Sequence, residues 1–311
     1  MLADLEVVKV RVIATIYLLS LVSACGSSDS LVSITSTETT SATPTVSLPS
    51  NLSYSADEIY WMELVNRARA DPRAEELRIQ AGSPSFNLES GLSAQLIARI
   101  GPTPPLAIHP LLVQLARNHS ADMGARNYFA HTNPDGLTPF DRLRAVNYVG
   151  AGGENIYAGN GRGVLDAYRG WMNSAGHRAN ILDLYASYKD SGIGVALITS
   201  GTYGNYFTQV FGSSSSSAAH LLGVIFRDVN ADNFYNSGEG VPGIRLDISK
   251  ESSIDSIESS STLEATGYFQ IPLQPDTYHL KFVNVSTNAV VREESNIVMG
   301  TGNIRLSLKI D

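Results

Sequence analysis

Residues 171–182 read WMNSAGHRANIL, and this stretch says more about the chain than any other. It places His177 at a glycine-containing turn directly after residues 164–174, whose apolar spacing predicts a helix. A second histidine, His119, shares one face of a predicted helix with apolar side chains, and Pro110 opens that helix. Between the two histidines, the Gly-rich residues 149–163 predict a loop around Glu154.

Five further short motifs keep a fixed order around these residues. They are Asn66-Arg67-Ala68-Arg69, Tyr128-Phe129-Ala130-His131-Thr132, Gly153-Glu154-Asn155-Ile156, Gly192-Ile193-Gly194-Val195 and Thr208-Gln209-Val210-Phe211-Gly212. The order closely resembles bacterial CAP domains (SCP; cysteine-rich secretory protein and pathogenesis-related family) over residues 55–212. This resemblance implies an α+β fold, a three-layer α-β-α sandwich with a central antiparallel sheet.

The resemblance also implies a cavity lined by two histidines and two acidic residues that can bind a divalent metal. His119, Glu154 and His177 match three of the four positions. The fourth, a glutamate in eukaryotic members, falls on Ser174 here. Two imidazoles and one carboxylate suit zinc with an open fourth position. Without metal, the same three side chains can carry general acid–base chemistry.

Two functions follow for this cavity. The first is a ligand-binding or interaction module for a small molecule, an apolar or sterol-like lipid, or an envelope component. The second is a metal-dependent hydrolase of peptides or envelope polymers that uses His119, Glu154 and His177. No serine lies in a Gly-x-Ser-x-Gly elbow, so together with the missing fourth acid the sequence favours binding. A third interpretation is purely structural, since a histidine on an apolar helix face is commonly a satisfied core residue. We interpret His131 as structural, and nothing places Asp166, an alternative acid, in the cavity.

The N-terminal residues have the features of an exported lipoprotein. Residues 10–24 form an apolar run of signal-peptide length with basic residues at its start, and the run ends in LVSAC at Cys25. This resembles a bacterial lipobox, which implies a signal peptide over residues 1–25 and lipidation of Cys25. Residues 26–54 are Ser/Thr-rich and predict an unfolded tether. We therefore expect an exported protein, lipid-anchored to a membrane of the cell envelope (outer membrane or cell surface) or extracellular. A plain secretory signal is the alternative.

A second domain follows a serine linker at residues 213–219. Short alternating segments over residues 220–311 predict an all-β sandwich. Its first loop resembles those of SdrD B-like and carboxypeptidase-regulatory-like modules, and it has the ligand spacing of an EF-hand. The spacing predicts a calcium site formed by Asp228, Asn230, Asp232, the carbonyl of Phe234, Asn236 and Glu239. The alternative is an acidic turn without an ion.

Net charge, the single cysteine and local sequence signals support four further predictions. The formal net charge is −8 and no basic stripe is present, which argues against nucleic acid as a partner. With one cysteine, the chain has no intramolecular disulfide. Ser55-Ala56-Asp57-Glu58 is a capping box that predicts a helix start, and this helix is expected to end at Asp71. Residues 192–199 and 205–211 predict two strands.

Overall fold

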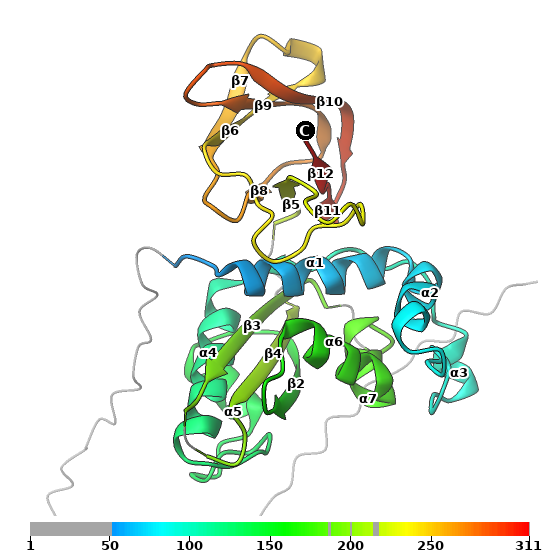
Figure 1. Cartoon of the computed structure of the whole chain (residues 1–311). Coiled ribbons are helices and arrows are strands. Elements are labelled where there is room, and N and C mark those ends of the chain that lie inside the picture. The colour runs from blue at the N-terminus through cyan, green and yellow to red at the C-terminus, as the bar shows by residue number, and fades with distance from the viewer. Residues whose placement is uncertain (1–51, 186–187, 200, 214–217, 311) are drawn as a thin grey trace, which may run out of the picture. The chain divides into compact units, whose positions relative to one another are not determined.

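A computed structural model describes residues 52–185, 188–199, 201–213 and 218–310. These residues form an α+β structure, with a part that contains all the described α-helices followed by an all-β part (Figure 1). No helix within the described ranges is both long enough and apolar enough to cross a membrane. The predictions for the signal peptide, Cys25, nearly all of the tether and most of the serine linker fall outside the described residues.

The helical part has three layers around one sheet. The strand order is β1-β3-β4-β2, antiparallel except that β1 pairs with β3 in parallel. The strands are β1 (Ala107–Ile108), β2 (Ala151–Gly159), β3 (Asp190–Leu197) and β4 (Asn205–Ser213). One face of the sheet is covered by α4 (Pro110–Ala125) and α5 (Pro139–Ala145), and the other by α1 (Ala56–Ala70), α6 (Val164–Asn173) and α7 (Ala175–Ile181). Two further helices, α2 (Pro72–Gly82) and α3 (Ala94–Ile97), follow α1.

Two glycines bring α4 into direct contact with the sheet. A Cβ added at Gly192 would lie 2.1 Å from the backbone nitrogen of Val113, and one at Gly194 would lie 2.1 Å from that of Arg117. Both glycines are on β3, so the helix backbone packs against the strand without side chains between them. This close approach fixes the height of α4, and therefore of His119, above the sheet.

The capping box at the start of α1 is confirmed. The Ser55 hydroxyl accepts a bond from the Glu58 backbone, and the Glu58 carboxylate accepts one from the Ser55 backbone. The predicted loop at residues 149–163 is wrong, because β2 occupies its centre and pairs with β4 along its whole length. Its glycines make room for neighbours: a Cβ on Gly153 would lie 2.4 Å from the Tyr188 hydroxyl.

The C-terminal part is a two-sheet sandwich, as the sequence predicted. One sheet has the order β10-β9-β6-β7, and in the other β5 pairs with β8, β11 and β12. Both sheets contribute to one hydrophobic core. The strands are β5 (His220–Phe226), β6 (Ile244–Lys250), β7 (Ile257–Thr262), β8 (Tyr268–Pro272), β9 (Asp276–Asn284), β10 (Val290–Met299), β11 (Ile304–Arg305) and β12 (Leu308–Lys309). The edge strands β7 and β10 are mostly solvent-exposed, and neither shows an alternation of apolar and polar residues that would predict it from the sequence.

The strand β5 contributes to two hydrophobic cores. Leu221 and Ile225 point into the sandwich, while Val224 and Phe226 pack into the core that contains α1. Polar bonds reinforce this contact, because the Gln270 amide exchanges hydrogen bonds of 2.7 and 3.0 Å with the Ile108 backbone. Continuous burial on both faces explains why β5 is an apolar run instead of an alternating strand.

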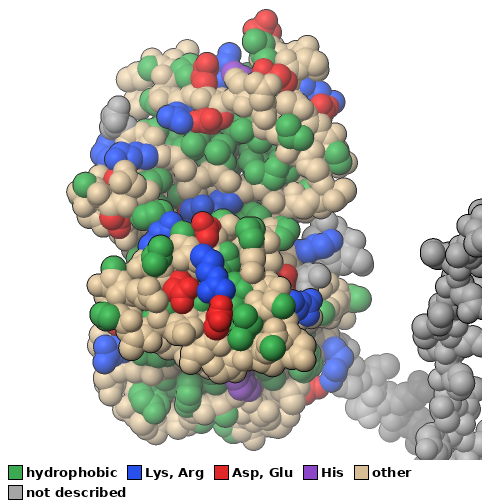
Figure 2. Space-filling view, turned by 90° about the vertical axis from the view of Figure 1, so that its right-hand side faces the viewer, with side chains coloured by type: hydrophobic (Ala, Val, Ile, Leu, Met, Phe, Trp, Pro, Cys, Tyr) green, Lys and Arg blue, Asp and Glu red, His purple; other side chains and the backbone are tan. Residues whose placement is uncertain are grey.

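On the face of the molecule shown in Figure 2, basic and acidic side chains are interspersed, and no continuous patch of either sign is visible. This distribution agrees with the many local ion pairs at the surface, such as Arg73 with Glu76.

Arg69, at the end of α1, is fully buried and links several segments. Its guanidinium donates to the carbonyls of Pro104, Ile181 and Tyr188 over 2.7 to 3.2 Å, and it pairs with Asp183 at 3.4 Å. Burial lowers the pKa of Arg69 to about 10, so the group remains charged at neutral pH. The Arg69 side chain therefore links α1 to the 98–106 loop, to the end of α7 and to the segment just before β3.

We predict that Arg69→Met lowers the free energy of unfolding by about 3 kcal/mol, since three buried carbonyls and Asp183 lose their donor. Urea denaturation followed by circular dichroism measures the loss. Arg73→Met is the matched control, because Arg73 is half-exposed, and it should change stability by less than about 0.5 kcal/mol. Equal effects of the two substitutions would contradict the role given to Arg69.

Candidate functional site

Helix α4 carries His119 on its sheet-facing side, where the side chain is 1% exposed. Its Nε2 lies 3.1 Å from the carbonyl oxygen of Ala130. Because a carbonyl only accepts, Nε2 bears the proton in this contact. The Tyr128 hydroxyl lies 3.4 Å from Nδ1 but donates to Asp122 at 2.6 Å. His119 thus donates a hydrogen bond to the backbone carbonyl of Ala130.

Strand β2 presents Glu154 on the same side of the sheet, with its side chain only 2% exposed. Both carboxylate oxygens have partners: Arg142 Nη2 lies 2.6 Å from Oε2, and His131 Nδ1 lies 2.9 Å from Oε1. His119 Nε2 is further away, at 3.8 Å from Oε1. The structure therefore brings His119, His131, Glu154 and Arg142 together.

Of these residues, His131 was interpreted from the sequence as structural, and Arg142 was not predicted at all. Arg142 lies on the short helix α5, which Thr138 and Asp141 cap reciprocally. Its other guanidinium nitrogen donates to the carbonyls of His131 and Leu137, so one arginine holds both the carboxylate and the loop that carries His131. The Phe129-Ala130-His131-Thr132 motif is the available signal for His131, but the motif alone does not distinguish a structural histidine from a partner of Glu154.

The backbone of His177, at the start of α7, lies beside Asn155 of β2. Its backbone carbonyl accepts a bond from the Asn155 side chain at 3.2 Å, and Asn155 points away from Glu154 because neighbouring strand residues face opposite sides. The His177 ring packs near Trp171, and its Nδ1 is buried without a hydrogen-bond partner among the described residues. Ser174 joins α6 to α7, where its carbonyl accepts from Arg178.

Asp166 stands apart from this group. It accepts a bond from the backbone of Gly163 at the start of α6, and its side chain is 40% exposed. Its contacts are those of a helix cap.

The arrangement does not fit a three-ligand zinc centre as it stands. The Glu154 oxygens are engaged by Arg142 and His131, and the His119 Nε2 by Ala130. Within the described ranges, no group of three or more His, Cys, Asp or Glu side chains is placed to hold a metal ion. Zinc binding by His119, Glu154 and His177 stays a prediction, and it requires Glu154 to exchange its present partners.

A surface depression of about 510 Å³ opens beside this cluster. Every lining residue has a polar or charged side chain, and the charges are paired: Arg126 contacts Asp122 and Asp135, and Arg142 contacts Glu154. The lining residues are Asn118, His119, Asp122, Arg126, Asn133, Asp135 and Arg142. The depression therefore offers many donors and acceptors with charges already compensated.

Burial lowers the pKa of His119, and the nearby Glu154 carboxylate opposes this only in part. Burial also lowers the pKa of His177, and a nearby His131 adds to the effect. Burial alone would raise the pKa of Asp122, but hydrogen bonds from Arg126 and Tyr128 outweigh it and lower that pKa. Both predicted cavity histidines are therefore neutral at pH 7.

In the predicted calcium loop, the ammonium of Lys309 lies 2.9 Å from Asp228 Oδ2 and 3.4 Å from Asn233 Oδ1. Glu239 accepts bonds from the backbones of Val229 and Asn236, and Asn233 has the left-handed φ of 66° expected for position six. The loop geometry thus holds a lysine cation next to its first ligand. Calcium binding stays a prediction, and it requires the Lys309 ammonium to leave Asp228.

Comparison with known proteins gives one family. Residues 62–211 match the CAP model, described as the cysteine-rich secretory protein family. These residues form a CAP domain. The CAP domain accounts for the helical part and its sheet, and the family match does not extend to the C-terminal sandwich.

Three known proteins resemble parts of the chain. "Uncharacterized protein YkwD" of Bacillus subtilis (strain 168) is 39% identical over 109 residues, which are 34% of this chain and 39% of that protein. An extracellular SCP-domain protein from Bacillus anthracis str. Ames is 36% identical over 36% of this chain and 34% of its own, with a TM-score of 0.30. An outer surface protein from Borrelia burgdorferi is 17% identical over 47% of this chain and 94% of its own, with a TM-score of 0.30. The chain thus spans well under half of the first two relatives.

Lys309→Met should increase the affinity for calcium, because it removes the cation that competes for Asp228 while nearly preserving the length of the side chain. We expect calcium chloride to raise the melting temperature of the variant more than that of the wild type, with about tenfold tighter binding by calorimetry. Lys281→Met, on β9, is the control and should behave as the wild type. If neither wild type nor Lys309→Met binds calcium, the ion-free acidic turn is correct.

The lowered pKa of His119 predicts a pH-dependent loss of stability. The unfolded histidine, with an ordinary pKa of 6.5, takes up a proton before the folded one, so stability falls as the pH drops from about 6.5 towards the folded pKa. His119→Gln should reduce this slope, by at most about 1.4 kcal/mol per pH unit. Urea denaturation between pH 7 and pH 5 measures it, and an unchanged slope would contradict a buried neutral His119.

Proposed function

We propose that this chain is an exported binding module whose CAP domain takes a neutral glycan of the cell envelope in the depression beside Glu154. The observation that carries the proposal is the charge balance of that depression. Its arginines and carboxylates pair with one another, so a charged ligand would have to break ion pairs. A neutral ligand rich in hydroxyls can instead bond to the remaining donors and acceptors.

Exposed apolar side chains support a glycan over a purely polar solute. The segment 126–142 supplies four of the depression's residues, and it also exposes Phe129, Leu137 and Phe140 at 46%, 46% and 54%. Apolar and aromatic side chains beside convergent polar groups are typical of a small-molecule site. The apolar faces of sugar rings suit such side chains, while their hydroxyls suit the depression. A sterol-like ligand fits less well, because every residue that lines the depression carries a polar or charged side chain.

Binding is favoured over hydrolysis by the state of the candidate catalytic groups. Glu154 is compensated by Arg142, and the Nε2 proton of His119 is directed at a backbone carbonyl. A general base needs a free lone pair that faces the substrate. Export is supported by the signal-like N-terminal sequence, and lipid anchoring rests on the LVSAC pattern at Cys25.

The test is a titration of the full chain with chitotetraose, a neutral N-acetylated wall-type glycan, followed by calorimetry. We expect saturable binding that Phe129→Ala and Asn133→Ala each weaken about tenfold, which corresponds to about 1.4 kcal/mol. Leu77→Ala is the matched control, since Leu77 is an exposed apolar residue on α2, and it should bind normally.

Chromatography of the same mixtures separates the two functions. An intact oligosaccharide after prolonged incubation supports the binding module. Shorter products that disappear in both His119→Ala and Glu154→Gln would support the hydrolase, and zinc-dependent products would support the metal-dependent form. The absence of both binding and cleavage would contradict a glycan site.

A further inference from the structure

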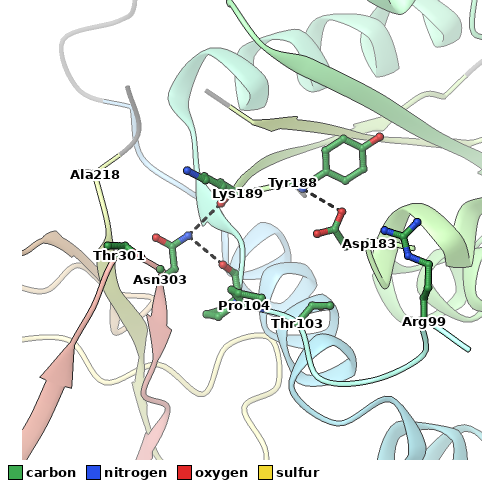
Figure 3. A pocket seen from close by; sticks show the side chains of 11 residues that line it. Arg99, Thr103, Pro104, Asp183, Tyr188, Lys189, Ala218, Thr301 and Asn303 are labelled. Atoms are coloured by element: carbon green, nitrogen blue, oxygen red, sulfur yellow. Dashed lines mark hydrogen bonds between the residues drawn. The ribbon is translucent and has the colours of Figure 1, made fainter. Parts of the chain in front are cut away.

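A second cavity, of about 360 Å³, lies between the CAP domain and the C-terminal sandwich (Figure 3). The loop before β1 contributes Thr103 and Pro104, the segment before β3 contributes Tyr188 and Lys189, and the turn before β11 contributes Asn303. The cavity is separate from the depression beside Glu154, and the two share no residue.

The cavity carries two cations without partners. Neither the guanidinium of Arg99 nor the ammonium of Lys189 makes a hydrogen bond or ion pair with any described residue, and Figure 3 shows them at opposite ends of the cavity. The carboxylate of Asp183 is already neutralised, since it pairs with Arg69 and accepts the Tyr188 backbone N–H. In a chain of net charge −8, a cavity with two cations that have no partner among the described residues selects for an anion.

Between the two cations, the cavity is lined by a hydroxyl group and by apolar side chains. The hydroxyl of Thr103 is buried without a hydrogen-bond partner among the described residues, which is uncommon for a buried polar atom. Pro104 and the Tyr188 ring, which stacks on Phe211, supply apolar surface nearby. An unpaired hydroxyl between apolar walls suits a ring that carries hydroxyl groups.

The surrounding groups are fixed in place before any ligand arrives. The Asn303 amide donates to the carbonyls of Pro105 and Lys189, and its oxygen accepts the His220 backbone N–H. Arg69 holds Pro104 and Tyr188 by their carbonyls. The walls therefore belong to a rigid frame, while Arg99 and Lys189 remain exposed and free to close on a ligand.

We infer that this cavity binds an anionic sugar unit, a hydroxylated ring with a phosphate or carboxylate group. The ring lies against Tyr188 and Pro104 and bonds to the Thr103 hydroxyl, and the anion pairs with Arg99 or Lys189. Since the CAP domain and the sandwich both line the cavity, the ligand stabilises their contact and raises the melting temperature.

The experiment titrates the full chain with glucose 6-phosphate, glucuronate, glucose and inorganic phosphate, with saturation-transfer NMR and calorimetry as readouts. At least one anionic sugar should bind about ten times more tightly than either glucose or inorganic phosphate. A preference for glucose 6-phosphate identifies a phosphate-bearing source, and a preference for glucuronate identifies a uronic acid. Equal binding of inorganic phosphate or glucose, or no binding of either anionic sugar, overturns the inference.

Substitutions locate the site. Arg99→Gln and Lys189→Gln should each weaken binding of the anionic sugar about tenfold, whereas Arg162→Gln, an exposed arginine on the β2–α6 loop, should leave it unchanged. Thr103→Val should weaken binding without lowering the melting temperature of the free protein, because its hydroxyl has no partner to lose within the described part of the chain. Binding that is insensitive to all three cavity variants, or equally sensitive to Arg162→Gln, contradicts the assignment.

Discussion

The buried carboxylate of Glu154 is the constraint on which the candidate site depends. Strand pairing places it below the surface, where an uncompensated charge is very unfavourable. Arg142 compensates that charge at 2.6 Å, and the same guanidinium fixes the loop that brings His131 to the other oxygen. The shape of the depression therefore depends on the ion pair between Glu154 and Arg142, because the same arginine fixes segment 126–142 through the carbonyl of His131.

Part of this site could be predicted from the sequence. His119 and Glu154 were expected near each other and lie 3.8 Å apart. Arg142 and the role of His131 could not be derived, because both depend on how a surface loop folds over β2. The glycine content of residues 149–163 predicted a loop, whereas Gly152, Gly153 and Gly159 lie in β2 and admit close neighbours. The expectation that His177 belongs to the same cavity stays a prediction, since the structure places its backbone carbonyl beside Asn155 and its ring near His131.

The fold was predicted more fully than the site. Capping residues and apolar periodicity predicted α1, α4 and α6, the strand signals of residues 192–199 and 205–211 predicted β3 and β4, and the family resemblance implied their arrangement in layers. The exposed strands β7 and β10 were missed because their residues carry no apolar alternation. The double burial of β5 was also missed, since one strand cannot reveal from its sequence that it serves two cores. That strand and Arg69 join regions far apart in sequence and give the anionic-sugar cavity its frame.

The central claim is that Glu154 is compensated by Arg142 and His131, with His119 a neutral donor to backbone. Long-range proton–nitrogen NMR of the histidine rings in the full chain tests it directly. At pH 7 we expect His119 to be neutral with its proton on Nε2. A doubly protonated His119 at pH 7, or a neutral ring with its proton on Nδ1, would contradict the account.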